Sequence, residues 1–76
     1  MTEPDVVVDC LGRPCPVPVI ELARAVAAAA PGTVVEVVSD DPASRHDVPA
    51  WCRMRGHAYL GETPHERGSG YRVRRS

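Results

Sequence analysis

The sequence contains few aromatic residues, and it has no phenylalanine and no lysine. With one tryptophan and two tyrosines in 76 residues, a hydrophobic core must be built from valine, leucine and alanine. The nine positive charges are all arginines, and a net charge of −1 gives no overall attraction to nucleic acid or to an anionic membrane. Because alanine, valine and proline are also abundant, the absence of lysine is more typical of coding bias than of a binding surface.

Long apolar runs and a closely paired cysteine motif are absent as well. No run approaches the roughly 18 to 20 residues of a membrane span, and the acidic segment 1–5 is not typical of a signal peptide. We therefore expect a cytoplasmic protein that contacts no membrane. Three cysteines, an odd number, do not make a disulfide framework, and the absence of a Cys-x-x-Cys pair does not favour a zinc site. We expect neither a bound metal nor another cofactor.

The composition and periodicity are those of one small folded domain spanning residues 1–76. Hydrophobic residues form 43% of the chain and charged residues 25%, which argues against a disordered chain. The apolar periodicity predicts six elements in the order strand 6–8, helix 16–30, strand 33–39, helix 43–55, strand 57–62 and strand 71–75. The sequence thus predicts an α/β (α+β) fold, a two-layer βαβαββ sandwich with a four-stranded mixed sheet and two helices on one face.

Polar and turn-forming residues indicate how these elements begin and end. Asp47 is expected to cap the main part of the second helix, with Pro49 in its first turn. The segment 68–70, Gly-Ser-Gly, predicts a loop before the last strand. Glu36, the one charged residue of the second strand, is expected to face solvent.

The segment 9–18 contains a cysteine between the first strand and the first helix. Because Cys15 precedes a proline, the pattern predicts Cys15 as the N-cap and Pro16 as the first helical residue. Pro18 has no N–H, so Val17 is left to donate its N–H to the sulfur. The positive end of the helix dipole favours a thiolate, and we expect the pKa of Cys15 to lie below its ordinary value. Cys15 is the candidate catalytic residue. The supporting turn and helix start comprise Gly12, Pro16, Val17 and Pro18.

A second loop is expected beside this turn. In a right-handed parallel βαβ unit the carboxyl ends of both strands lie at one edge of the sheet, which brings Asp40 and Asp41 next to Cys15. These carboxylates are expected to accept backbone N–H groups and to orient the loop. The charged residues assigned to the edge of the site are Asp9, Arg13, Asp41 and Arg45.

The remaining cysteines and the histidines have structural interpretations. Cys10 lies close enough in sequence to Cys15 to act as a resolving thiol, but a small core residue on the apolar face of the first strand is the favoured interpretation. Cys52 shares a helix face with Trp51 and is expected in the core. No histidine has a spacing that places it on Cys15, so no general base is expected there.

These features together resemble the TusA-like family of small sulfur carriers, also called SirA-like. The segments that carry the resemblance are, in chain order, Val8-Asp9-x-Leu11-Gly12, Cys15-Pro16-Val17-Pro18, Ser39-Asp40-Asp41-Pro42-Ala43, Asp47-Val48-Pro49-Ala50-Trp51, Gly56-His57 and Tyr71-Arg72. The resemblance implies the βαβαββ sandwich and a reactive Cys15 that carries sulfane sulfur as a persulfide. It also implies two protein partners, a cysteine desulfurase or rhodanese-like donor and an acceptor protein, without direct binding of nucleic acid.

Two departures from the family pattern leave the pathway open. Arg13-Pro14 and a longer loop over 63–70 touch surfaces that recognise partners, so tRNA thiolation, molybdenum-cofactor maturation and sulfur oxidation all stay open. Two other classes of function stay open as well. A dithiol redox protein would pair Cys10 with Cys15 in a reversible disulfide, and a non-catalytic binding or regulatory module would show no unusual thiol reactivity.

Overall fold

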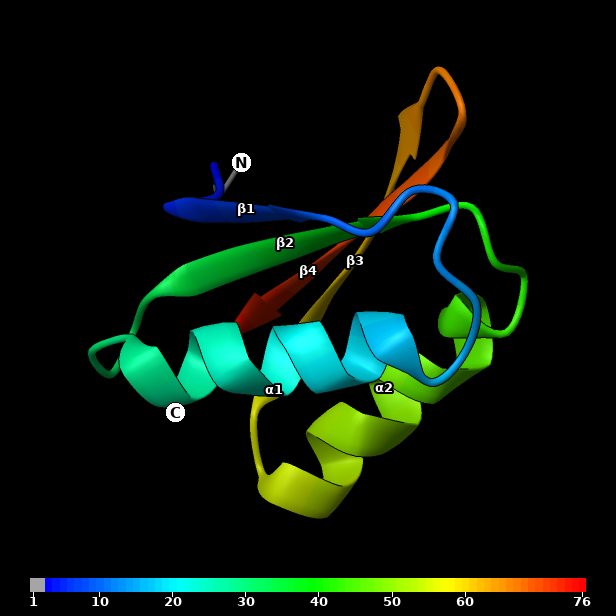
Figure 1. Ribbon diagram of the computed structural model, residues 1–76. Coiled ribbons are helices and arrows are strands. Elements are labelled where there is room, and N and C mark those ends of the chain that lie inside the picture. Colours follow the sequence, from blue (N-terminus) through cyan, green and yellow to red (C-terminus); the bar gives the residue numbers. More distant parts are fainter. Residues whose placement is uncertain (1–2) are drawn as a thin grey trace.

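The chain folds into six elements in the expected order. A computed structural model describes residues 3–76. Its elements are β1 (Val6–Asp9), α1 (Val17–Ala28), β2 (Val34–Ser39), α2 (Ser44–Arg55), β3 (Ala58–His65) and β4 (Gly68–Arg74). Figure 1 shows α1 and α2 on the same face of the sheet. The predicted fold class, with two helices and a four-stranded mixed sheet, is confirmed.

The sheet has the strand order β1-β2-β4-β3. β1 and β2 are parallel neighbours with α1 as the crossover between them, whereas β4 is antiparallel to both β2 and β3. The N–H of Cys10 donates to the carbonyl of Val38 (2.8 Å), which continues the parallel pairing to the carboxyl ends of both strands. The loops that follow β1 and β2 therefore leave the sheet at the same edge, as Figure 1 shows.

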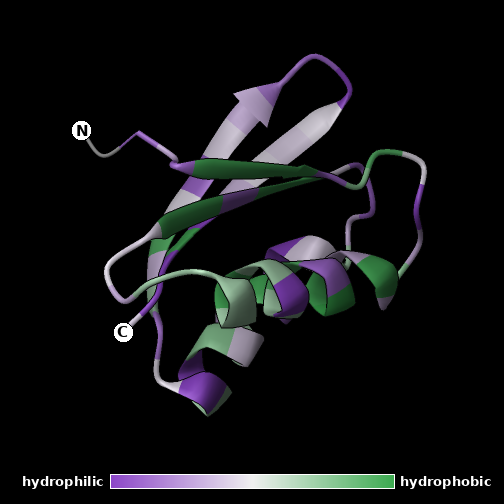
Figure 2. Ribbon diagram, turned by 60° about the vertical axis from the view of Figure 1, so that its left-hand side comes forward, coloured by the Kyte–Doolittle hydropathy of each residue, from purple (hydrophilic) through white to green (hydrophobic). Residues whose placement is uncertain are grey.

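The core lies between the sheet and the helix layer. Valines of β2 and β4 meet apolar residues of both helices, and the side chains of Leu22, Val35, Val37, Val48 and Val73 are fully buried. Figure 2 shows that β1 and β2 are strongly hydrophobic, whereas the β3–β4 hairpin is mostly neutral or hydrophilic. Valine thus supplies the sheet side of a core that lacks phenylalanine.

The first helix is shorter at both ends than the sequence predicts. Pro16 has non-helical backbone angles (φ −100°, ψ 17°) and occupies the N-cap, so α1 begins at Val17. The helix ends at Ala28, because Ala29 is already extended (φ −94°, ψ 157°). Ala30 precedes Pro31, and a residue before proline avoids the helical region, which disfavours a helix that runs to Ala30.

The second helix is continuous, and the predicted cap is wrong. α2 begins at Ser44 with Ala43 as its N-cap, and Pro49 lies inside the helix. A proline there removes one helical hydrogen bond. The helix stays continuous because α2 also packs on the sheet. Asp47 lies in the first turn rather than at the cap. Its carboxylate is therefore available for contacts outside the helix.

The β3–β4 hairpin is longer than the sequence predicts. β3 extends to His65 and β4 begins at Gly68, so the predicted loop over 63–70 is wrong and residues 66–67 form the turn. Gly70 lies inside β4, where a Cβ atom would come within 2.6 Å of Glu36 Cδ. The strand needs glycine at this position because the Glu36 side chain crosses it.

Glu36 is buried, which contradicts its expected exposure to solvent. Its neighbours in β2 point to the helices, so Glu36 points to the opposite face of the sheet. There Oε1 accepts hydrogen bonds from Arg72 Nε (2.7 Å) and Thr63 Oγ1 (3.1 Å), and Oε2 lies 3.1 Å from His65 Nε2. Burial acts to raise the pKa of Glu36, but the hydrogen bonds from Arg72 and Thr63 outweigh it, and the pKa is lowered.

Candidate functional site

Cys15 lies in the turn between β1 and α1, at the sheet edge where β2 also ends (Figure 1). Gly12 begins this turn with a φ of 77°, a left-handed conformation that glycine adopts without strain. Residues 3–76 contain all three cysteines, each of them free, and among these Cys15 alone is exposed. The turn therefore presents one thiol to solvent.

The start of α1 does not bind the sulfur in the way the sequence predicts. Pro16 occupies the N-cap instead of Cys15. No side chain of the described residues forms a capping hydrogen bond at the start of α1. The N–H of Val17, expected to donate to the sulfur, donates to the carbonyl of Pro14 (3.0 Å). The predicted N-cap role of Cys15 is therefore wrong, and its thiol is free to bond elsewhere.

The thiol bonds to the second helix. Cys15 Sγ donates a hydrogen bond to Asp47 Oδ2 at 3.1 Å. This hydrogen bond, with partial desolvation and the negative charges of Asp47 and Asp41, raises the pKa of Cys15 above its ordinary value of 9.0. The predicted lowering of this pKa is wrong, because carboxylates rather than helix N–H groups face the sulfur. In this geometry Cys15 is a protonated thiol at neutral pH.

Asp41 connects the cysteine turn to the start of α2. Its Oδ2 accepts the N–H of Cys15 (2.6 Å), and its Oδ1 accepts the N–H of Ala43 (2.9 Å). Its own N–H donates to Ser39 Oγ (3.1 Å). The backbone hydrogen bonds from Ala43 and Cys15 lower the pKa of Asp41, so this carboxylate stays charged. One side chain thus fixes both loops at the edge of the sheet.

Two further aspartates hold the first part of the turn. Asp40 accepts the N–H of Gly12 through Oδ1 (3.0 Å) and Oδ2 (3.1 Å). Asp9 accepts the N–H of Leu11 through Oδ1 (3.0 Å). The expectation that the carboxylates after the second strand accept backbone N–H groups is confirmed. The turn around the thiol is therefore held by negative groups on several sides.

Arg13 and Arg45 lie in neighbouring hollows that share Asp41. The hollow beside the cysteine turn is lined by Gly12, Arg13, Pro14, Asp40 and Asp41. Arg45 lines the next hollow, and its guanidinium donates to both carboxylate oxygens of Glu62 (3.1 and 3.2 Å). Both arginines thus lie near the turn, and their role in recognising partners stays a prediction.

Cys10 and Cys52 belong to the core, where each is 1% exposed. Burial is the main cause that raises the pKa of both thiols, to about 11 for Cys52. In the described part of the chain no disulfide joins Cys10 to Cys15. The burial of Cys10 fits the core interpretation and weighs against a resolving thiol.

Two of the three histidines contact residues other than Cys15. His57 stacks on Trp51 with ring centroids 5.3 Å apart, His65 contacts Glu36, and His46 is exposed on α2.

Within residues 3–76 no three metal-ligating side chains form a group. The helices described there are also too short or too polar to cross a bilayer.

Almost the whole chain, residues 6–75, matches the model of a known family described as sulfurtransferase TusA. The chain belongs to the TusA family. The sulfur carrier protein TusA of Pseudomonas paraeruginosa is 40% identical over 70 residues, which cover 91% of this chain and 87% of that protein. The protein of the same name from Pseudomonas putida is 40% identical over 57 residues, covering 75% of this chain and 71% of that protein.

A solved structure shares the TusA-family fold. The SirA-like protein from Desulfitobacterium hafniense has a TM-score of 0.75 to this chain at 27% sequence identity. The match covers 91% of this chain and 93% of that protein. The two-helix, four-stranded architecture described above is therefore common to both.

Asp47 is the site residue of this TusA-family chain that sequence reasoning missed. The sequence interpretation assigns it only to capping the second helix. Its position carried a further signal, because it lies in the first turn of a helix that starts at the sheet edge where Cys15 lies. A carboxylate there meets the thiol, although 32 residues separate the two in sequence.

Proposed function

We propose that the chain carries sulfane sulfur as a persulfide on Cys15, accepting it from a donor protein and passing it to an acceptor protein. Membership of the TusA family and relatives named sulfur carrier proteins support a sulfur-carrier role. The observation that carries the assignment to Cys15 is its exposure, since the other two cysteines are buried. The backbone N–H of Cys15 is also fixed by Asp41, which gives the thiol a defined position.

Loading is a thiol exchange at sulfur. The Cys15 thiol loses its proton to solvent once the docked donor has displaced its hydrogen bond to Asp47. The Cys15 thiolate attacks the outer sulfur of the donor's persulfide, and the donor's S–S bond breaks. The electron pair leaves on the donor's inner sulfur, which takes up a proton as a thiol. One sulfur atom has moved between two thiols with no external oxidant or reductant.

Delivery repeats this exchange in the opposite direction. A thiolate of the acceptor attacks the outer sulfur of the Cys15 persulfide, and the S–S bond to Cys15 breaks. The electron pair returns to Cys15 Sγ, which takes up a proton and restores the hydrogen bond to Asp47. The acceptor then holds the persulfide.

Asp47 also gives the unloaded carrier a protonated resting state. The thiolate is the reactive form of cysteine, so the raised pKa makes the free protein slow to react with unrelated electrophiles. A donor that hydrogen-bonds to Asp47 on docking removes the first cause of that raised pKa. Reactivity is then linked to formation of the complex.

The donor in this proposal is a cysteine desulfurase or a rhodanese-like protein, because both present sulfur as a protein persulfide. Arg13 and Arg45 are the proposed charged contacts at the rim of the site, on either side of Asp41. We place the reaction in the cytoplasm, where thiols stay reduced, and the free state of all three cysteines is consistent with this.

Two other functions fit the site less well. A dithiol redox protein would need Cys10 as the partner of Cys15, and Cys10 is buried. A binding module without thiol chemistry is compatible with the raised pKa of Cys15 taken alone. The sulfur-carrier relatives favour the carrier over both.

Mass spectrometry tests the proposal directly. After incubation with a cysteine desulfurase and cysteine, we expect the protein to gain the mass of one sulfur atom, and a reducing agent should reverse the gain. Cys15→Ser should lose this ability, whereas Cys52→Ser, in which a buried thiol is changed, should keep it. Normal loading of Cys15→Ser would show that the assignment to Cys15 is wrong.

A further inference from the structure

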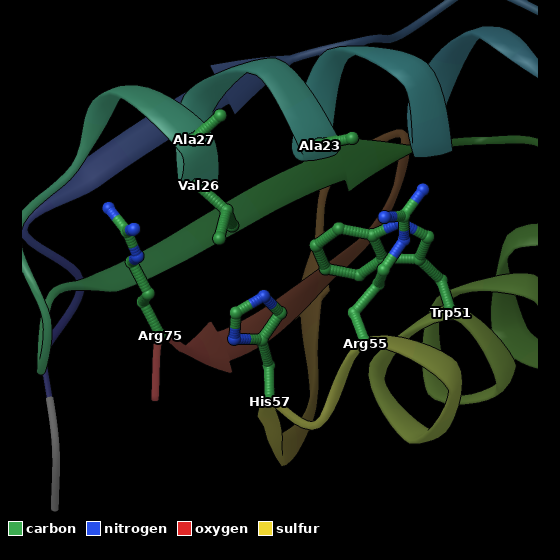
Figure 3. A pocket seen from close by; sticks show the side chains of 7 residues that line it. All are labelled: Ala23, Val26, Ala27, Trp51, Arg55, His57 and Arg75. Atoms are coloured by element: carbon green, nitrogen blue, oxygen red, sulfur yellow. The ribbon is translucent and has the colours of Figure 1, made fainter.

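A pocket lies at the C-terminal ends of the two helices, whereas Cys15 lies before the start of α1. Its volume is about 320 Å³, at the low end of the range found for small-molecule sites. The apolar part of its lining comes from Ala23, Val26 and Ala27 of α1 and from Trp51 of α2. Figure 3 shows these side chains around an opening between α1, α2 and the start of β3.

The polar lining groups of this pocket include no carboxylate. Arg55 and Arg75 each contribute a guanidinium, which is charged at neutral pH and can only donate hydrogen bonds. His57 Nδ1 accepts the backbone N–H of Ser76 (3.1 Å), so the ring hydrogen lies on Nε2. Figure 3 shows His57 between Arg75 and Arg55. The rim therefore offers donors and positive charge.

Two of these groups are fixed by other contacts. The His57 ring stacks on Trp51, with centroids 5.3 Å apart. Arg75 Nη1 donates to the carbonyl of Ala29, at the C-terminal end of α1. Side chains that are already ordered lose less conformational entropy when a ligand binds. The pocket thus has a preformed floor and a largely preformed rim.

We propose that this pocket binds a small organic carboxylate, with the charged group at Arg55, His57 and Arg75 and the apolar body over Trp51 and Val26. A carboxylate accepts hydrogen bonds without donating any, and its two oxygens match the paired N–H groups of a guanidinium. The apolar floor selects ligands that also carry a hydrophobic body. The site is separate from the sulfur-carrier turn and does not depend on its function.

Trp51 makes the proposal testable, because it is the one tryptophan of the chain and it lines the pocket. Titration of the intact protein with 3-phenylpropionate should change the tryptophan fluorescence until it saturates. At the same concentrations, 3-phenylpropanol lacks the charge and acetate lacks the apolar body, so neither should produce a saturable change. The absence of saturation with 3-phenylpropionate, or equal binding of the alcohol, would overturn the proposal.

Matched arginine variants locate the charged group. Arg55→Gln should weaken binding about tenfold through loss of one charge-assisted hydrogen bond. Arg53→Gln changes an exposed arginine of the same helix that does not line the pocket, and it should change the affinity by less than about twofold. Equal weakening by both variants would mean that general charge attraction causes the binding, and would overturn the assigned site.

Two more measurements test whether the pocket is independent of Cys15 and whether its ligand is a small molecule. Cys15→Ser should bind 3-phenylpropionate with unchanged affinity, which distinguishes failure of this proposal from failure of the sulfur-carrier role. The peptide N-acetyl-Ala-Ala-Phe, with a free terminal carboxylate, should bind no more tightly than 3-phenylpropionate. Much tighter binding of the peptide would assign the pocket to a protein C-terminus and overturn the small-molecule assignment.

Discussion

Replacing Arg72 with methionine tests whether the buried carboxylate of Glu36 depends on its ion pair. Arg72 Nε lies 2.7 Å from Glu36 Oε1, and the two side chains are 17% and 4% exposed. Arg72→Met keeps much of the apolar length of the side chain but removes the charge. The carboxylate is then left with Thr63 and His65, each at 3.1 Å.

The size of the effect follows from this burial. Removal of one partner of a buried ion pair typically costs about 3–5 kcal/mol of stability. Because Thr63 and His65 still contact Glu36, we expect a loss of about 3 kcal/mol in Arg72→Met. In a domain of this size each kcal/mol lowers the Tm by about 4–8 °C, so the Tm should fall by roughly 12–24 °C.

Urea unfolding at neutral pH, followed by the fluorescence of Trp51, measures this loss. The double variant Glu36→Leu with Arg72→Met removes both charges and should recover most of the stability, because no unpaired charge stays buried. A loss below about 1 kcal/mol in Arg72→Met is the size of an exposed ion pair. That result would refute the conclusion that Glu36 is a desolvated charge held by Arg72.

The same carboxylate predicts how stability depends on pH. The pKa of Glu36 is lowered in the folded state from its ordinary value of 4.5, so the unfolded chain takes up the proton first as the pH falls. The stabilisation by ionised Glu36 is complete above that ordinary value and is lost as the pH falls through the folded-state pKa. Urea unfolding across this acidic range should show a smaller loss in Glu36→Gln than in the unchanged protein, and equal losses would contradict the assignment.

Three further substitutions test the site and the packing. Asp47→Asn should lower the pKa of Cys15, because the hydrogen bond to the Asp47 carboxylate is the first cause of its raised value. The pH dependence of iodoacetamide alkylation measures this pKa, and an unchanged profile would contradict the prediction. Gly70→Ala should cost about 1–3 kcal/mol in urea unfolding, since the new Cβ would lie within 2.6 Å of Glu36 Cδ. Leu22→Ala, at a side chain that is 0% exposed, should cost about 2–5 kcal/mol in the same assay, and a near-neutral result would mean that the helix layer packs loosely.

The order of elements could be predicted because it depends on short-range patterns. The valine-rich segment around Val35 and Val37 has few alternatives to a buried strand, and the helical spacing of Leu22 and Val26 specifies a buried face. The right-handed crossover then places the ends of β1 and β2 at one edge. These steps need no knowledge of which side chains meet across the fold.

The errors arose where a distant side chain decides the outcome. The segment around Cys15 predicts an activated N-cap thiol, but Asp47, 32 residues further along, accepts its hydrogen bond and reverses the direction of the pKa shift. Glu36 has the pattern of a solvent-facing residue, but Arg72, 36 residues away, allows it to be buried. Gly70 has the pattern of a loop, but it lies within β4, where the buried Glu36 side chain leaves no room for a Cβ atom.

The contact between Cys15 and Asp47 makes the two halves of the proposed sulfur transfer unequal. Sγ can donate to Asp47 only as a thiol, because in a persulfide it is bonded to carbon and to the outer sulfur and carries no hydrogen. Loading therefore breaks this hydrogen bond and adds a sulfur about 2 Å further out. Delivery lets Sγ take up a proton again and restores this hydrogen bond. The hydrogen bond to Asp47 thus stabilises the unloaded carrier relative to the loaded one, so in the proposed transfer it opposes loading and favours delivery.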